Sequence, residues 1–240
     1  MTTLFVSDIH LNGAQPEITA QLVDFLRGEA RRAEHVYILG DLFEFWIGDD
    51  DPDPTYAQIQ HELQMLTAAG VPCSVMYGNR DFLMGTQFCK RTGCHLIADG
   101  TIIELYGQRV LLMHGDTLCT DDHSYQRLRR IVRNPLVQWL FKSLSLTRRQ
   151  RIAARIRAGS QMHTQRSAMT IMDVNSNAVT RAFEQSSTQL LVHGHTHRPA
   201  IHQHITRLGE CTRIVLGDWH LQGSVLRWSQ AGYDLVSLPR

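Results

Sequence analysis

The chain has 240 residues, 43% of them hydrophobic and 20% charged, with a formal net charge of +1, which excludes disordered and fibrous proteins. The five cysteines are scattered and form no C-x-x-C pair, which argues against a disulfide framework and a cysteine zinc site. The N-terminus lacks the pattern of a signal peptide and no stretch approaches the roughly 20 apolar residues of a membrane span, so we expect a cytoplasmic protein.

Six short apolar runs rich in β-branched residues predict buried strands. They lie at residues 4–6, 36–39, 73–77, 110–113, 190–192 and 214–216. Apolar residues at helical spacing predict helices over residues 16–32 and 56–69. Strands that alternate with helices indicate an α/β core, and the tail from Ala200 onward reads as further strands and turns. We expect a single domain over residues 1–240.

One segment, residues 121–170, differs from the rest of the chain in charge and in pattern. It contains eleven Lys or Arg residues and two acidic residues, so its charge is +9 and the remainder of the chain carries −8. Apolar residues recur at helical spacing from Leu128 to Leu140 and continue to Leu146. We therefore predict a basic and apolar helical cap inserted into the α/β core.

Metal-binding residue types follow five of the predicted strands. The groups are Asp8-Ile9-His10, Gly40-Asp41, Gly78-Asn79-Arg80-Asp81, His114-Gly115-Asp116 and Gly194-His195-Thr196-His197. A single group of this kind often occurs by chance. Five groups in this order, all at strand ends where α/β proteins form their sites, predict a metal centre. The candidate ligands are Asp8, His10, Asp41, Asn79, His114, His195 and His197.

The spacing within two of these groups suggests how the ligands are presented. Asp8 and His10 are two residues apart, as are His195 and His197. On an extended backbone, the two side chains of each pair would point the same way. Seven ligands are more than one cation needs, so we predict two neighbouring divalent cations that share a carboxylate and activate water.

The five groups resemble the signature of the calcineurin-like metallophosphoesterases, and they span most of the chain. The resemblance implies an αββα sandwich with the metal centre on its loops. It also implies that Asp41 bridges the two cations. One cation would take Asp8, His10, Asp41 and His197, and the other would take Asp41, Asn79, His114 and His195.

One position departs from the broader family, which usually has a histidine after the asparagine. Here that position is Arg80. Arginine cannot release a proton near pH 7, but its planar fork binds phosphate oxygens in pairs. This favours a substrate with more than one phosphate, whose leaving group needs no protonation. The catalytic residues implied are Asp41, Asn79, Arg80, His114 and His195.

Longer motifs, such as residues 78–83 and 193–199, resemble a narrower family over essentially the whole chain. This family, the diphosphatases of lipid A biosynthesis, hydrolyses a diacylated sugar nucleotide with Mn(II) at the cytoplasmic face of the bacterial inner membrane. The resemblance implies that the chain contacts this membrane peripherally. The substrate contacts implied are Asn79, Arg80, Asp122, Ser160, Thr164, Ser167 and His195.

In this interpretation, the inserted segment binds the acyl chains and the charged head of the substrate. Its apolar residues would line a pocket for the acyl chains, and Arg157 with its neighbours would meet the charged head or anionic lipid. The candidate pocket residues are Trp139, Leu140, Phe141 and Leu144. The family usually has a lysine where this chain has Ser167, and Arg166 stands beside it.

Three other interpretations stay open at this point. The same metal chemistry could act on a soluble nucleotide diphosphate or a cyclic phosphodiester, but the insert would then have no role. The fold could serve as a non-catalytic scaffold, although all seven candidate ligands are intact. The arginine-rich insert could bind nucleic acid, but its interleaved apolar residues suit lipid at least as well, and we expect no nucleic-acid partner. The sequence leaves the oligomeric state open.

Overall fold

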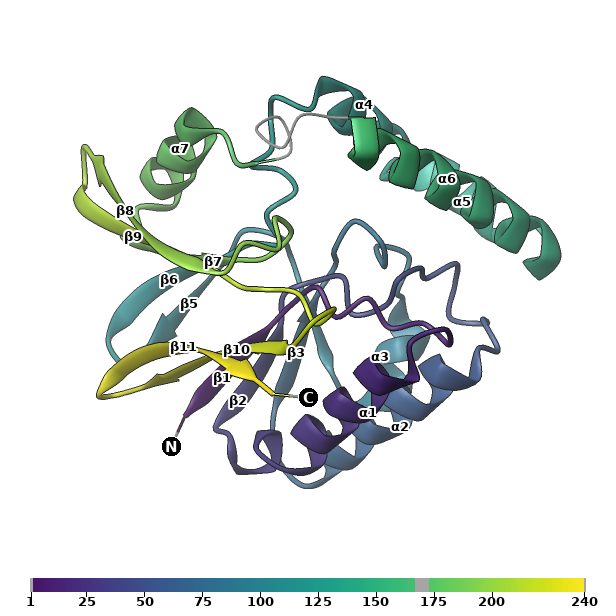
Figure 1. Cartoon of the computed structure of the whole chain (residues 1–240), viewed down its shortest axis with the longest axis horizontal. Helices are drawn as coiled ribbons and strands as arrows, with labels where there is room; N and C mark the ends of the chain where they lie inside the picture. The colour runs from purple at the N-terminus through teal and green to yellow at the C-terminus, as the bar shows by residue number, and fades with distance from the viewer. Residues whose placement is uncertain (1, 167–172, 240) are drawn as a thin grey trace.

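The computed structural model describes residues 2–166 and 173–239, and for residues 157–166 it describes the helical backbone only. Two β-sheets pack face to face, and helices cover the outer face of each sheet (Figure 1). Three further helices form a separate layer above one end of the sandwich. This is the predicted αββα arrangement with a helical cap.

The six-stranded sheet has the order β11-β10-β1-β2-β3-β4. Strands β1 to β4 run parallel, and β10 pairs antiparallel with β1. Every residue of β1 and β3 is buried, because both faces of the sheet are covered. The strands are β1 (Thr3–Val6), β2 (His35–Ile38), β3 (Cys73–Met76), β4 (His95–Ile97), β10 (Gly223–Ser229) and β11 (Gly232–Leu238).

The five-stranded sheet has the order β5-β6-β7-β9-β8. Strands β6, β7 and β9 run parallel, while β5 and β8 pair antiparallel at the two edges. The carboxyl ends of β6 and β7 therefore lie together, as do those of β1, β2 and β3 in the other sheet. The strands are β5 (Thr101–Leu105), β6 (Gln108–Leu112), β7 (Leu190–His193), β8 (Ala200–Thr206) and β9 (Gly209–Val215).

Helices α1, α2 and α3 cover the six-stranded sheet (Figure 1). Proline begins both α1 and α2, where its missing N–H leaves no hydrogen bond unmade, and Asp53 caps α2 by accepting from Thr55 N at 2.8 Å. Leu22 and Leu63 are fully buried against the sheet. The helices are α1 (Pro16–Arg27), η1 (Ala30–Arg32), α2 (Pro54–Ala68) and α3 (Thr86–Thr92).

Helix α7 (Ser176–Ser186) covers the five-stranded sheet. Its residues Val179 and Phe183 are fully buried in a cluster with strand residues of that sheet. A separate apolar layer fills the space between the two sheets. Its buried members are Phe5, Leu39, Met76, Leu105, Val110, Leu112, Val192, Ile214, Leu216, Leu226 and Trp228.

The cap consists of α4 (His123–Val132), α5 (Pro135–Lys142) and α6 (Leu146–Arg166). No residue of α4 or α5 is fully buried. Besides partly buried side chains such as Phe141, hydrogen bonds from arginines attach the cap to the sandwich. Arg129 Nε donates to Asp116 Oδ2 at 2.6 Å, Arg133 Nη2 to the carbonyl of Gly78 at 2.7 Å, and Arg149 Nη1 to Asp50 Oδ1 at 2.7 Å.

The observed elements differ from the predicted ones in several places. The helix predicted over 16–32 ends at Arg27, because Gly28 turns the chain and only the short η1 follows. Elements α3, α7, β4 and β5 were not among the predicted elements. All five cysteines carry free thiols. Among the described helices, none combines the length and apolar content needed to cross a bilayer.

Candidate metal centre

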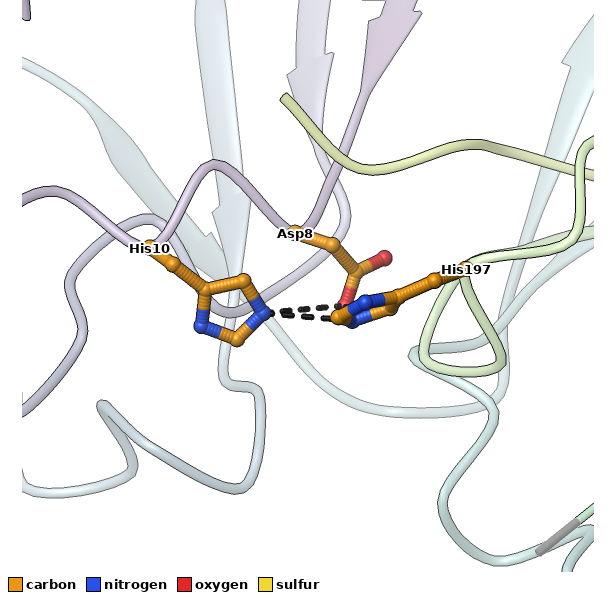
Figure 2. Close-up of side chains that lie close together, drawn as sticks. All are labelled: Asp8, His10 and His197. Atoms are coloured by element: carbon orange, nitrogen blue, oxygen red, sulfur yellow. Dashed lines mark hydrogen bonds and ion pairs between the residues drawn. The ribbon is translucent and has the colours of Figure 1, made fainter. Parts of the chain in front are cut away.

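Six of the predicted ligands form two groups at the carboxyl ends of strands from both sheets. One group, which we call the Asp8 cluster, contains Asp8, His10 and His197 (Figure 2). The other, the Asp41 cluster, contains Asp41, His114 and His195. Within each cluster, one donor atom from every residue lies within 4.8 Å of the others. The fold thus brings together residues that are distant in sequence, as the five motifs at strand ends predicted.

Asp41 belongs to the Asp41 cluster and also faces His10 of the Asp8 cluster. Its Oδ2 atom is 3.8 Å from His10 Nε2 and 3.8 Å from His114 Nε2. Asn79, the seventh predicted ligand, places Oδ1 at 3.0 Å from His114 Nε2. One carboxylate oxygen is therefore equidistant from an imidazole of each cluster, as a bridging ligand requires.

The backbone of these residues is not extended, and the prediction that each Asp or His pair lies on an extended segment is wrong. Asp8, His10, Asp41, His195 and His197 all have φ between 52° and 68°, in the left-handed region. Such values are uncommon outside glycine and concentrate at functional sites. The left-handed turns send the side chains of His195 and His197 into different clusters instead of the same one.

Two glycines allow the backbone to pass directly behind the carboxylates. A Cβ atom on Gly194 would lie 2.1 Å from Asp8 Oδ2, and one on Gly78 would lie 2.0 Å from Asp41 Oδ1. No side chain fits at either position. The sequence motifs Gly78-Asn79 and Gly194-His195 thus reflect a steric requirement as well as turn formation.

The imidazoles of the Asp8 cluster are oriented as cation ligands. His10 Nε2 and His197 Nε2 lie 3.2 Å apart. The Nδ1 atom of His197 faces Asp218 Oδ2 at 3.0 Å, and that of His10 faces Glu44 Oε2 at 3.2 Å. With a proton on each Nδ1, facing these carboxylates, both Nε2 lone pairs point into the same space between the rings. A cation in that space would be ligated by both rings, so the residues fit a cation.

The imidazole of His114 is arranged in a similar way in the Asp41 cluster. Its Nδ1 atom lies 2.9 Å from the carbonyl oxygen of Leu39, which assigns the proton to Nδ1. Its Nε2 atom lies 3.0 Å from Asn79 Oδ1, so both atoms point into the same space and a cation there would be ligated by both. The donor set of carboxylate, imidazole and amide oxygen suits divalent cations such as Mn(II).

The carboxylate of Asp8 is fully buried and held in place through one oxygen. Oδ2 accepts hydrogen bonds from Ser7 Oγ at 2.6 Å and from His195 N at 2.8 Å. Oδ1 has no hydrogen bond to the described residues and points toward His197, at 3.5 Å from Nε2. Burial alone would raise the pKa of Asp8, but His197 and the other imidazoles hold it well below its usual range.

The histidines of the two clusters have shifted pKa values, and the direction differs within the Asp41 cluster itself: burial opposes protonation of His114, yet Asp41 and Asp8 raise its pKa to about 9. Burial opposes protonation of His197, yet Asp218 and Asp8 raise its pKa to about 10. Burial and the nearby His114 lower the pKa of His195 to about 4. Asp8, Asp41 and Asp218 therefore attract positive charge to the centre, while the imidazole of His195 is neutral at physiological pH.

A pocket adjoins the Asp41 cluster and runs between the sandwich and the cap. Asn79 and Arg80 are among its lining residues, and Arg80 Nε is buried without a hydrogen bond to the described residues. The rest is lined mainly by apolar side chains from the sandwich and the cap. These include Phe45, Trp46, Phe82, Leu83, Leu128, Val132, Val137, Phe141 and Ile156.

The pocket differs from the predicted one in its lining. Phe141 lines it, but Trp139 and Leu140 are 64% and 51% exposed and do not. The two residues follow Gln138 on α5, and helical geometry turns them to the outer surface of the cap. Leu144, also predicted, is half-buried outside the pocket lining.

The remaining predicted substrate contacts are only partly described. Asp122 is buried at the start of α4, where its Oδ1 accepts from Tyr125 N at 2.9 Å and Ser124 Oγ at 2.7 Å. The side chains of Ser160 and Thr164, the residue Ser167, and the side chain of Arg157 lie outside the described residues.

Several site residues were not predicted from the sequence. Glu44 and Asp218 contact the Asp8 cluster, and Tyr125, Arg129 and Arg133 line the pocket. Asp218 had a detectable signal, because it follows Gly217 directly after a predicted strand, as the recognised ligands do. Nothing in the sequence distinguished Arg129 and Arg133, because they are two of eleven basic residues in the insert.

Comparisons with known proteins agree with this geometry. A family model for the calcineurin-like phosphoesterases matches residues 1–199. The chain is 49% identical over 239 residues to UDP-2,3-diacylglucosamine hydrolase of Escherichia coli O81 (strain ED1a), with 100% of both chains covered. A relative of the same name in Shigella boydii serotype 18 (strain CDC 3083-94 / BS512) matches equally.

Among solved structures, the chain resembles an archaeal phosphodiesterase with a TM-score of 0.50. The match covers 99% of this chain and 100% of the other at 12% sequence identity. At this identity the likeness concerns the fold alone.

Proposed function

Because the chain belongs to the calcineurin-like phosphoesterase family and, within it, to the UDP-2,3-diacylglucosamine hydrolases, we propose that it hydrolyses UDP-2,3-diacylglucosamine. Water cleaves the diphosphate bond, and the products are 2,3-diacylglucosamine 1-phosphate and UMP. The observation that carries this proposal is that Asn79, whose Oδ1 lies 3.0 Å from His114 Nε2 of the Asp41 cluster, lines a mainly apolar pocket together with Arg80. The residues that would act on the diphosphate therefore lie beside the surface that would bind the lipid.

The residues present fit two divalent cations, and we propose Mn(II) for both. When bound, the cations lower the pKa of water toward neutrality and neutralise charge on the phosphate oxygens. The side chains that would hold them are Asp8, His10, Asp41, Asn79, His114, His195 and His197.

Arg80 binds the diphosphate in this proposal. Its Nε atom is buried, faces no acceptor among the described residues, and lines the pocket beside Asn79. A guanidinium fork binds two phosphate oxygens at once and stays charged throughout the reaction. Whichever phosphorus water attacks, the leaving group is a phosphate that needs no proton donor, so an arginine suffices where an acid would otherwise be needed.

The pocket orients the lipid part of the substrate. Its lining from Phe82, Val137, Phe141 and Ile156 offers apolar surface for acyl chains. Binding energy from these chains would hold the diphosphate against Arg80 and the Asp41 cluster, away from bulk water. Contacts of the sugar and phosphate with Asp122, Ser160, Thr164 and Ser167 belong to the same proposal.

The outer surface of the cap contacts the cytoplasmic face of the inner membrane. Ile131, Leu136, Trp139 and Leu140 are between 51% and 64% exposed on α4 and α5. Exposed basic residues stand among them, and this pairing of apolar and basic groups suits an anionic lipid surface. The basic residues are Arg127, Arg130, Lys142 and Arg148.

The proposal is tested by loading the purified protein with Mn(II) and measuring UMP release from UDP-2,3-diacylglucosamine. We expect release that EDTA abolishes and Mn(II) restores. UDP-glucose, which has the same diphosphate but no acyl chains, should react far more slowly. Equal turnover of the two substrates would instead indicate a general nucleotide diphosphatase.

A further inference from the structure

The two clusters differ in the groups that lie behind their imidazoles. In the Asp8 cluster, Asp218 Oδ2 lies 3.0 Å from His197 Nδ1 and Glu44 Oε2 lies 3.2 Å from His10 Nδ1. In the Asp41 cluster, His114 Nδ1 faces the neutral carbonyl of Leu39 at 2.9 Å. Two full negative charges therefore stand behind the first cluster, while a backbone dipole stands behind the second.

Asp218 is fixed by its own loop, which follows β9. Its second oxygen, Oδ1, accepts a hydrogen bond from His220 N at 3.1 Å. The preceding residue, Gly217, donates its N–H to Ser224 Oγ at 3.0 Å. The carboxylate therefore has a defined position before it meets His197.

Glu44 is also held near the cluster by the backbone. Its N–H donates to the carbonyl of Leu11 at 3.0 Å, and its side chain is only 12% exposed. The ring of His220 lies 5.6 Å from the ring of His10 and nearly parallel to it. The imidazole of His10 thus contacts both a carboxylate and a stacked ring.

The surroundings of the Asp41 cluster carry charges of both signs, including the buried carboxyl of Asp81, which accepts hydrogen bonds from Leu42 N and Gly78 N at 2.8 Å. Arg80, Arg129 and Arg133 line the adjoining pocket. The nearby Asp116 is neutralised by Arg129, whose Nε lies 2.6 Å from Oδ2. Cation binding is favoured by surrounding negative charge and disfavoured by positive charge.

We propose that Asp218 and Glu44 are positioning residues that strengthen cation binding at the Asp8 cluster, Asp218 by holding the Nδ1 proton of His197 and Glu44 by placing a negative charge 3.2 Å from His10 Nδ1. They do not touch substrate or cation. Asp218 holds its imidazole so that the Nε2 lone pair points into the cluster, and both residues add negative charge behind a ring. The inference rests on the two-cation centre proposed above.

The test is a calorimetric titration of the metal-free protein with Mn(II), which does not depend on turnover. We expect Asp218→Asn and Glu44→Gln each to weaken one binding step by roughly 10- to 100-fold, the range for lost partners of metal ligands. The other step should be unchanged. His114→Asn, which removes a ligand of the Asp41 cluster, identifies the step that belongs to that cluster.

Asp234→Asn serves as the matched control, because Asp234 is exposed on β11 and its loss changes the net charge equally. This variant should bind Mn(II) as the native chain does. The inference is overturned if Asp218→Asn and Glu44→Gln bind Mn(II) as the control does, or weaken both steps equally, or lower the melting temperature of the metal-free protein. A native chain that binds no Mn(II) would instead contradict the proposed metal centre itself.

Discussion

Five of the candidate ligands adopt a left-handed backbone, and this conformation costs energy. For a residue other than glycine, it costs on the order of 1–2 kcal/mol. Asp8, His10, Asp41, His195 and His197 share this feature, while only Tyr106 and Ser187 show it elsewhere in the described part of the chain. The surrounding sheets and the buried hydrogen bonds of the two clusters hold the strained turns in place.

Asp41→Asn tests the bridging carboxylate with little change in structure. Asparagine tolerates the left-handed backbone, and its Oδ1 can still accept the hydrogen bond from Arg80 N that Asp41 Oδ1 accepts at 2.8 Å. We expect UMP release to fall by more than about 100-fold, because loss of a ligand exceeds the roughly 10- to 100-fold cost of losing a ligand's partner.

Circular dichroism melting should show that the Asp41→Asn variant is folded, with Asp234→Asn as the control for the lost charge. A folded Asp41→Asn protein that keeps a tenth or more of the native turnover would contradict the bridging role.

At this scale the sequence predicted which side chains converge but not how their backbone presents them. Aspartate and histidine at strand ends were recognisable because few residue types serve as ligands. The turns depend on tertiary contacts, such as Asp8 N with the carbonyl of Gly40 at 3.1 Å, which no local pattern encodes. The role of the seven residues as ligands stays a prediction.

At the scale of helices and strands, long elements were predicted and short ones were missed. Helix α3 has seven residues and β4 has three, too few for a periodic pattern to stand out. Helix α7 is amphipathic, but the basic insert before it obscured its start. Its capping residue Asn175, which accepts from Asn177 N at 2.9 Å, was the available signal.

An ion pair between two helices gives a prediction about acid stability. On α2, Glu62 accepts hydrogen bonds from Arg27 of α1 at 2.6 and 2.9 Å, and Arg27 thereby lowers the pKa of Glu62. A carboxyl with a lowered folded pKa stabilises the fold above its unfolded pKa, and this contribution is lost as the pH falls through the folded value.

The melting temperature of the native chain should therefore exceed that of Glu62→Gln near neutral pH. This difference should shrink as the pH falls from about 5 to about 3. Thermal melting of both proteins across this range measures it. A difference in melting temperature that stays constant with pH would show that ionisation of Glu62 does not stabilise the fold.

At the scale of the whole molecule, the distribution of charge along the sequence separates a basic insert from an acidic remainder. The helical cap follows from that division and from apolar spacing. Its attachment to the sandwich could not be predicted, because Arg129 and Arg149 find Asp116 and Asp50 only once both layers are folded.

Trp139→Asp tests whether the outer surface of the cap contacts lipid. Burying one large apolar side chain contributes about 1.5–3 kcal/mol, so binding to anionic vesicles should weaken by roughly 10- to 100-fold. Flotation with vesicles rich in phosphatidylglycerol measures this. Ile205→Asp is the control, since Ile205 is 82% exposed on β8, outside the cap. Equal effects of the two variants would contradict a specific lipid-facing surface.

The absence of fully buried residues from α4 and α5 has a further consequence for local unfolding. Amide protons exchange with solvent whenever a segment opens, and the energy of opening follows the apolar packing that must be broken. Helices α1 and α2 can open only by exposing fully buried residues such as Leu22 and Leu63, whereas α4 and α5 release partly buried side chains such as Phe141 and a set of hydrogen bonds. Deuterium should enter the amides of α4 and α5 long before it enters the helices beneath the sheet.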